Sequence, residues 1–157
     1  MKKILILIFI ISSLDAIAQT NQTDSVSFCE KLFPIPSSCA TPSRFQIFCD
    51  DYSMYWFYPA KALLSLTFKI FVDGMIKELD SCRQDSIHVF LLNQRVPTIK
   101  LACIVKGVPH YQVVSCGIVN NQAVLNVLNL WKNPKTNDDL PFPIKQILRL
   151  KWTAHNK

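Results

Sequence analysis

The sequence has very few of the residues on which phosphate-binding and metal-dependent motifs depend. It contains three glycines and three histidines in 157 residues. Three glycines leave no glycine-rich phosphate-binding loop, and neither a Gly-x-Ser-x-Gly nor a His-Glu-x-x-His motif occurs. No Cys-x-x-Cys or His-x-x-x-His spacing is present, so no zinc site is expected. These absences argue against a metal-dependent or nucleotide-dependent enzyme, and we expect no cofactor.

The catalytic residues that are present form no recognisable set. His88 and His110 fall in apolar, strand-like runs, and a nucleophilic pair of Cys116 with His110 is the best arrangement that the sequence offers. In an exported protein Cys116 is better explained as a disulfide-bonded or packed residue. We therefore expect that the protein is not an enzyme.

Long hydrophobic runs are limited to the N-terminus. Lys2 and Lys3 precede an apolar run over residues 4–11, and Ala16-Ile17-Ala18 supplies the small residues of a signal-peptidase site. The run is shorter than the ~20 residues that span a bilayer. The pattern therefore predicts a signal peptide over residues 1–18, cleaved before Gln19, a secreted or periplasmic location and no stable membrane span.

A strong excess of charge of either sign is also absent. After cleavage the chain has 139 residues, which suits one domain with a sizeable core. It keeps 15 basic and 10 acidic side chains, and the excess is concentrated from Lys132 onward. A net charge of +5 fits an ordinary solvated face better than a nucleic-acid surface. We expect no nucleic-acid partner.

Cysteine, in contrast, is plentiful, and every copy lies after the predicted cleavage site. In an oxidising compartment all six are candidates for disulfides, and the fifteen possible pairings stay open: Cys29, Cys39, Cys49, Cys82, Cys103 and Cys116. In a hairpin that turns at Gly107-Val108, Cys103 and Cys116 share a face but lie roughly 13 Å apart. Each is then a buried thiol or is bridged to another element.

Periodicity predicts a hairpin and a helix in the middle of the chain. Residues 99–105 alternate between two faces, Lys106-Gly107-Val108-Pro109 interrupts the alternation, and residues 111–119 are again apolar and β-branched, as in a strand. Beyond Gly117, polar residues recur every three or four positions, at Gln122, Asn126, Asn129 and Asn133, opposite Val124, Leu128 and Trp131. This spacing predicts an amphipathic helix that ends at Pro134.

The N-terminal part is rich in cysteine, proline and aromatic residues. Asp24 is a candidate cap for a short helix through Leu32, and residues 45–49 alternate as in a strand. Five aromatic residues follow in residues 52–58. We favour core packing for this run; an exposed strip including Tyr55 and Trp56 that stacks on a sugar or a peptide is the alternative.

Three segments keep two interpretations each. Residues 59–82 fit a helix with an apolar stripe from Leu64 to Leu79, or a hairpin that turns at Asp73-Gly74. Residues 86–94 fit a strand or a short helix. Residues 144–152 fit a final strand, with a helix after Pro143 as the alternative.

The order of motifs in the last third resembles the C-terminal domain of TonB-type energy transducers. The motifs that carry the resemblance are Trp131-Lys132-Asn133-Pro134, Asn137-Asp138-Asp139, Leu140-Pro141 and Leu148-Arg149-Leu150, with Tyr58-Pro59 and Asp73-Gly74 before them. The resemblance implies an α+β fold in which two or three helices pack on one face of an antiparallel sheet. It assigns this domain to residues 58–157, after a Cys/Pro-rich segment at 19–57.

The same resemblance implies a function in binding. In that family an extended peptide joins the edge of the sheet through main-chain hydrogen bonds. The matching edge strand covers residues 146–152, with Gln146, Leu148, Leu150 and Trp152 as candidate contacts. The expected partner is a protein or peptide, such as an outer-membrane or envelope protein.

The chain also departs from that family. Lys106-Gly107 stands where the family has an acidic turn, and neither an anchor after cleavage nor a proline-rich spacer is present. Such a domain can bind a partner but cannot transmit force to it. The alternative function is a periplasmic inhibitor or immunity-type protein, whose disulfide-stiffened surface blocks a site on another protein.

Overall fold

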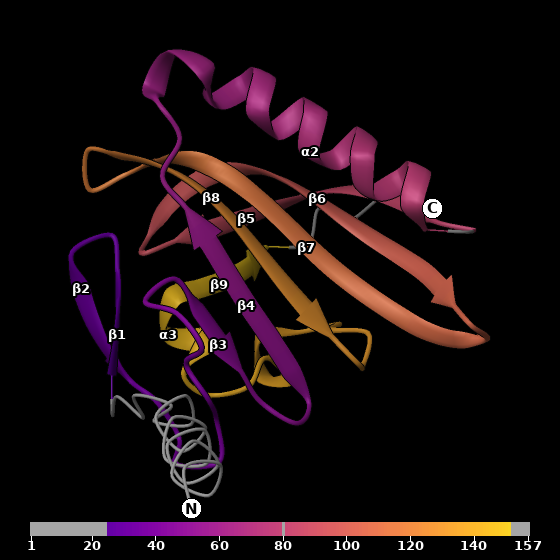
Figure 1. The fold of residues 1–157 in the computed structure, drawn as a ribbon, viewed down its shortest axis with the longest axis horizontal. Coiled ribbons are helices and arrows are strands. Elements are labelled where there is room, and N and C mark those ends of the chain that lie inside the picture. Colours follow the sequence, from indigo (N-terminus) through magenta and orange to yellow (C-terminus); the bar gives the residue numbers. More distant parts are fainter. Residues whose placement is uncertain (1–24, 80, 152–157) are drawn as a thin grey trace, which may run out of the picture.

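The computed structural model describes residues 25–79 and 81–151 of the chain. Its main element is a curled antiparallel sheet of seven strands in the spatial order β3-β4-β8-β7-β6-β5-β9 (Figure 1). A separate two-stranded hairpin is formed by β1 and β2. The predicted signal peptide and Trp152 lie outside the described residues.

The elements follow one another along the chain with these bounds: β1 (Ser25–Phe28), β2 (Lys31–Pro34), β3 (Gln46–Phe48), β4 (Tyr52–Phe57), the 3₁₀ helix η2 (Lys61–Leu63), α2 (Leu64–Glu78), β5 (Arg83–Leu91), β6 (Gln94–Val105), β7 (Val108–Val119), β8 (Gln122–Leu130), the 3₁₀ helix η3 (Asn137–Asp139), α3 (Ile144–Ile147) and β9 (Leu148–Lys151). Strands β3 and β4, from the Cys/Pro-rich segment, lie in the same sheet as strands from residues 58–157.

Four hairpins have two-residue turns in which both residues have positive φ: Cys29-Glu30, Leu92-Asn93, Lys106-Gly107 and Asn120-Asn121. Positive φ at both positions is the type I′ turn, whose twist matches that of the flanking strands. Gly107 is the single glycine among these residues. The other turn positions are occupied by asparagine and by bulkier residues. Positive φ costs a non-glycine residue about 1–2 kcal/mol.

One face of the sheet is covered by α2. Its inward residues, which include Phe68, Phe71 and Val72, pack against Val114 and Leu125 of β7 and β8. The segment that the sequence left open between helix and hairpin is therefore a helix. The helix lies over the sheet beside β7 and β8 (Figure 1). Its apolar stripe is buried there, whereas Leu66 and Ile70 of α2 and Leu63 of η2 are exposed.

The opposite face carries the larger core. Met54 of β4 and Val89 of β5 belong to the same cluster, although these strands lie near opposite edges of the sheet. The cluster also contains Ile144 and Ile147 of α3 and Phe28 of the β1–β2 hairpin. Because the sheet curls toward this face, both of its edges contribute to one hydrophobic core.

The predicted fold class is wrong. Instead of two or three helices on one face of a sheet, the described residues form a mostly β structure in which α2 covers one face and the short α3 lies on the other. The helix expected at residues 24–32 is the β1–β2 hairpin.

The helix expected after Gln122 is also wrong, since this segment is strand β8. Asn126 was assigned to a solvated face because of its spacing, yet it is completely buried. β8 lies between α2 and the larger core, so both of its faces are apolar and its sequence does not alternate cleanly. A buried asparagine in such a run imitates the polar side of a helix.

The β6–β7 hairpin is confirmed, with a shifted register. The turn is centred on Lys106-Gly107, so Ile99 lies opposite Val114 and not opposite Cys116. Parity is kept, and Cys103 and Cys116 are not bonded to each other. Cys103 is bonded to Cys82, and Cys116 is a buried free thiol, as the separation of the two residues predicted.

Candidate functional site

The aromatic run packs inside the molecule. Trp56 is 2% exposed, and its ring meets Phe28 and Phe45 edge-on with centroids 5.5 and 6.4 Å away. Tyr55 is half-buried and faces Phe71 of α2 at 6.3 Å. Core packing, the favoured interpretation, is therefore confirmed for most of the run, and neither Tyr55 nor Trp56 forms an exposed stacking strip.

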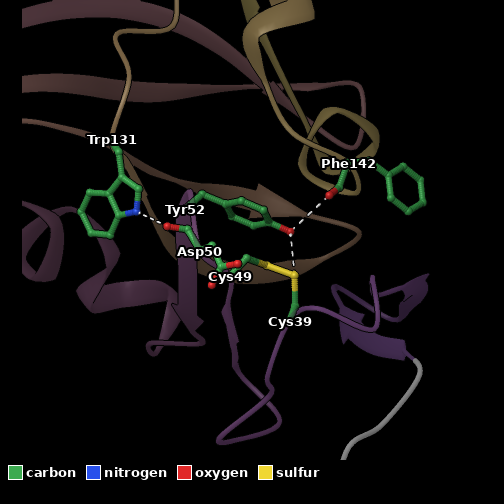
Figure 2. The surroundings of a disulfide bond; sticks show 6 residues. All are labelled: Cys39, Cys49, Asp50, Tyr52, Trp131 and Phe142. Atoms are coloured by element: carbon green, nitrogen blue, oxygen red, sulfur yellow. Dashed lines mark hydrogen bonds between the residues drawn. A yellow bond between two sulfur atoms is a disulfide. The ribbon is translucent and has the colours of Figure 1, made fainter.

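The β3 edge of the sheet is occupied by the chain itself. The Cys39–Cys49 disulfide closes a loop, and Ala40 and Phe48 exchange two main-chain hydrogen bonds of 2.7 and 2.8 Å across it. Figure 2 shows how the surroundings hold this loop: the Tyr52 hydroxyl lies between Cys39 and the Phe142 carbonyl, to which it donates at 3.2 Å. The outward groups of Phe48 are therefore not available to another strand.

The β9 edge, which contains the predicted binding strand, is also occupied. The side-chain amide of Asn137 donates to the Leu150 carbonyl at 3.1 Å, and its oxygen accepts the Leu150 N–H at 2.6 Å. The Leu148 N–H donates to the Ile144 carbonyl. Leu148 and Leu150 point into the core, and Gln146 lies in α3 and not in a strand. Asn137 thus takes the place of a neighbouring strand.

The turn that presents Asn137 is held by Asp139. Its carboxylate accepts the backbone N–H groups of Thr136 and Lys135, each at 2.7 Å, and the Thr136 hydroxyl at 3.2 Å. Because these bonds favour the ionised form, they lower the pKa of Asp139. The closed edge therefore depends on a local network at η3.

Within the described residues, strand β5 has an open half. It pairs with β6 along all of Arg83–Leu91 but with β9 only from His88 to Leu91. The main-chain groups of Leu150 point toward Asn137, so Val89 and Leu150, although opposite each other, share no main-chain hydrogen bonds. In an antiparallel ladder, hydrogen-bonded and non-hydrogen-bonded pairs alternate. Gln84 and Ser86 must then direct their N–H and C=O groups away from β6, where no strand of the described residues lies.

The open half of β5 is pinned at its end by a disulfide. Cys82 immediately precedes β5 and is bonded to Cys103 of β6. Arg83, the next residue, pairs with Ala102. A covalent bond at the tip of a strand that has a neighbour on one side opposes fraying, so the disulfide holds this edge in an extended conformation.

A shallow hollow of about 470 Å³ adjoins the same strand on the face that α2 covers. Its apolar side chains come from Phe68 of α2 and from Pro97 and Ile99 of β6, and its polar side chains come from Ser86, His88 and Arg95. Ile87 and Val96 also line it, but their side chains belong to the larger core on the other face. Ser86 therefore belongs both to the open edge and to the hollow.

Two buried polar residues face each other across β7 and β8. Ser115 and Asn126 lie directly opposite each other on β7 and β8, both fully buried, and the Ser115 hydroxyl and the Asn126 amide have no hydrogen-bond partner within the described residues. The spacing of Asn126 was interpreted as the polar side of a helix, and Ser115 lies in the run of residues 111–119 that was predicted as a strand, so neither was singled out.

The residues considered for catalysis are not brought together. Six positions on β7 separate His110 from Cys116, about 20 Å at ~3.3 Å per residue. His110 instead faces the Trp131 ring at 5.0 Å. In residues 25–79 and 81–151, no three His, Cys, Asp or Glu side chains lie close enough together to hold a metal ion. None of the helices described there is long and apolar enough to cross a membrane.

No protein-family model matches the chain, and no curated protein matches it significantly. Neither result bears on the resemblance to TonB C-terminal domains, which stays a prediction.

Proposed function

We propose that the protein is an exported binding module that takes up an extended segment of another protein as an additional strand along the open half of β5. One observation carries this proposal: Gln84 and Ser86 direct main-chain groups to a side where the described residues supply no strand. The outer sides of β3 and β9 are closed by Ala40 and Asn137. The proposal keeps the strand-addition mode and moves it from β9 to β5.

The geometry of β5 suits this mode of recognition. Main-chain hydrogen bonds to an exposed edge supply affinity, and pockets for alternate side chains supply specificity. The hollow beside Ser86 is such a pocket. The Cys82–Cys103 disulfide lowers the entropy that the edge loses on binding, because the edge is already extended.

Export supports the proposal without being part of the site. The two disulfides, Cys39–Cys49 and Cys82–Cys103, fit a protein of an oxidising compartment. Removal of the signal peptide by cleavage before Gln19 is part of the same proposal. No specific observation favours the alternative of an inhibitor or immunity-type protein, because Tyr55 and Trp56 pack within the chain.

A proline at Ser86 tests strand addition. Peptides selected from a displayed random library on the immobilised protein serve as probes. Ser86→Pro removes the outward N–H without touching the β6 ladder, and we expect at least about tenfold weaker binding, the loss of roughly one main-chain hydrogen bond and its neighbours. Ser86→Ala keeps the N–H and should bind within about twofold of the parent. Titration calorimetry measures both.

Amide exchange gives the second readout. Binding should slow exchange of the Ser86 and Gln84 amides, while the Asp85 and Ile87 amides, which face β6, change little. If Ser86→Pro fails to fold, Gln84→Pro near the strand end replaces it. Unchanged affinity of a folded proline variant, unchanged exchange at Ser86, or a library that yields no binding peptide would each count against strand addition at β5.

A further inference from the structure

The uncovered part of the α2-side face carries a cluster of basic residues. His88 of β5 lies opposite both Pro97 of β6 and Lys151 of β9. Phe90, two residues along, lies opposite both Arg95 and Arg149. Side chains of directly paired residues lie on the same face of a sheet. His88, Arg95, Arg149 and Lys151 therefore share one face; we call these four residues the basic cluster.

No member of the basic cluster forms an ion pair with a carboxylate among the described residues. The ion pairs of the described part of the chain are Lys69–Asp73 and Arg83–Asp85, and neither includes a member of the cluster. Arg95 instead approaches the His88 ring, 2.7 Å from Nε2, and Arg149 donates to the Asn93 side chain at 2.5 Å. Like charges gathered on one face repel one another, so an anionic group placed there gains free energy.

The cluster adjoins both features of the proposed binding edge. His88 and Arg95 line the hollow together with apolar residues such as Phe68 and Ile99. Lys151 is the last described residue of β9 and lies opposite His88. A strand added along residues 83–87 of β5 lies in line with β9, and Lys151 is the β9 residue nearest to it among those described. The site thus offers an apolar floor, a cationic rim and a row of main-chain groups.

We infer that the bound segment is acidic: an extended peptide with an apolar side chain in the hollow and an aspartate or glutamate beside it, paired with Arg95 and Lys151. This inference rests on the proposed function and names its partner class. The open main-chain groups of Gln84 and Ser86 favour a peptide over a fatty acid or an inorganic anion, because only a peptide supplies alternating donors and acceptors along a strand.

A matched pair of peptides tests the inference. Both are extended peptides of alternating valine and threonine, one with aspartate at a threonine position and one with asparagine there, prepared with the substitution near either end. We expect the aspartate peptide to bind about fivefold more tightly, as for exposed ion pairs to two cations, and the preference to shrink as salt is added.

Two double variants of the full chain locate the effect. Arg95→Gln with Lys151→Gln should abolish the preference for aspartate while the asparagine peptide keeps its affinity. Lys31→Gln with Lys145→Gln removes the same charge from exposed positions on β2 and α3, and should keep the preference. Thermal unfolding of each variant confirms that it is folded.

The outcomes separate the two proposals. If both peptides bind the parent equally, or if the Lys31 and Lys145 variant loses the preference as well, the acidic ligand is overturned while strand addition stands. If neither peptide binds and the Ser86 amide exchanges unchanged, strand addition itself has failed.

Discussion

At the scale of single residues, the two cysteines outside the disulfides, Cys29 and Cys116, are buried free thiols. Cys29 lies in the β1–β2 turn and belongs to the larger core, whereas Cys116 lies beneath α2 on the other face. The sheet separates them, so they cannot bond to each other. Burial raises the pKa of each thiol to about 11, and Glu30 adds to the effect at Cys29.

Thiol labelling tests this assignment. The thiolate is the reactive form, so at pH 8 about one thiol in a thousand is ionised and iodoacetamide should leave both cysteines unmodified in the folded protein. After unfolding without reductant, two labels should add, and after reduction six. Mass spectrometry of the exported protein counts the labels and also shows whether the chain begins at Gln19. Rapid labelling of the folded protein would contradict the burial of these thiols.

At the scale of elements, two glycines act in opposite ways. A Cβ on Gly117 of β7 would lie 2.4 Å from Val96 Cγ1 on the neighbouring strand, so this glycine allows close contact in the larger core. A Cβ on Gly74 of α2 would meet nothing within 4 Å. Gly117 is needed for packing, whereas Gly74 costs the helix stability without any return in contacts.

Alanine at each glycine tests the contrast. Gly117→Ala should lower the free energy of unfolding by about 1–3 kcal/mol through overpacking. Gly74→Ala should raise it by about 1 kcal/mol, because alanine has the higher helix propensity. Chemical denaturation measures both, and each serves as the control for the other. A Gly117→Ala protein as stable as the parent would mean that Val96 yields without cost.

Only part of the arrangement at the β5–β9 edge of the sheet could be predicted from the sequence. The sequence predicted an edge strand over residues 146–152, and residues 148–151 form β9 at an edge of the sheet. The closure of this edge by Asn137 was not predicted, because the two hydrogen bonds join a side chain of η3 to the main chain of β9, and no local sequence pattern indicates such a contact. The part of β5 that has no second partner among the described residues was not predicted either, since it depends on the pairing of β5 with β9, which lies far along the chain.

At the scale of the whole molecule, the two disulfides lie toward opposite edges of the sheet. Cys39–Cys49 closes a loop over β3, and Cys82–Cys103 ties the start of β5 to β6. Both loops are short, with sequence separations of 10 and 21. Each bond should therefore contribute comparable stability, while only the second lies at the proposed binding edge.

Paired serine substitutions separate stability from binding. Cys39→Ser with Cys49→Ser, and Cys82→Ser with Cys103→Ser, should each lower the free energy of unfolding by about 2–4 kcal/mol. We expect the second pair also to weaken peptide binding, because the open half of β5 then frays, and the first pair to leave the affinity of the folded fraction unchanged. Denaturation curves and calorimetry measure the two effects. Equal losses of affinity would show that the Cys82–Cys103 bond has no special part in the site.

The sequence by itself determined the local features of this protein. The alternation in residues 99–105 and the apolar run of residues 111–119 specify a hairpin, because a half-buried strand repeats every two residues. The same hairpin register placed Cys103 and Cys116 on one face but too far apart along the strands to bond to each other. The apolar stripe of α2 was present as one of two interpretations, and contact with β7 and β8 selected it.

Only the tertiary structure decided which segments are covered on both sides and which edge stays open. β8 became a strand because α2 and the larger core bury both of its faces, a condition that no local period expresses. Among the described residues Gln84 and Ser86 have no partner strand, since β9 is described as far as Lys151, opposite His88, and Asn137 closes the outer side of β9. Burial and edge pairing join residues that are distant along the chain, and periodicity reports only on neighbours.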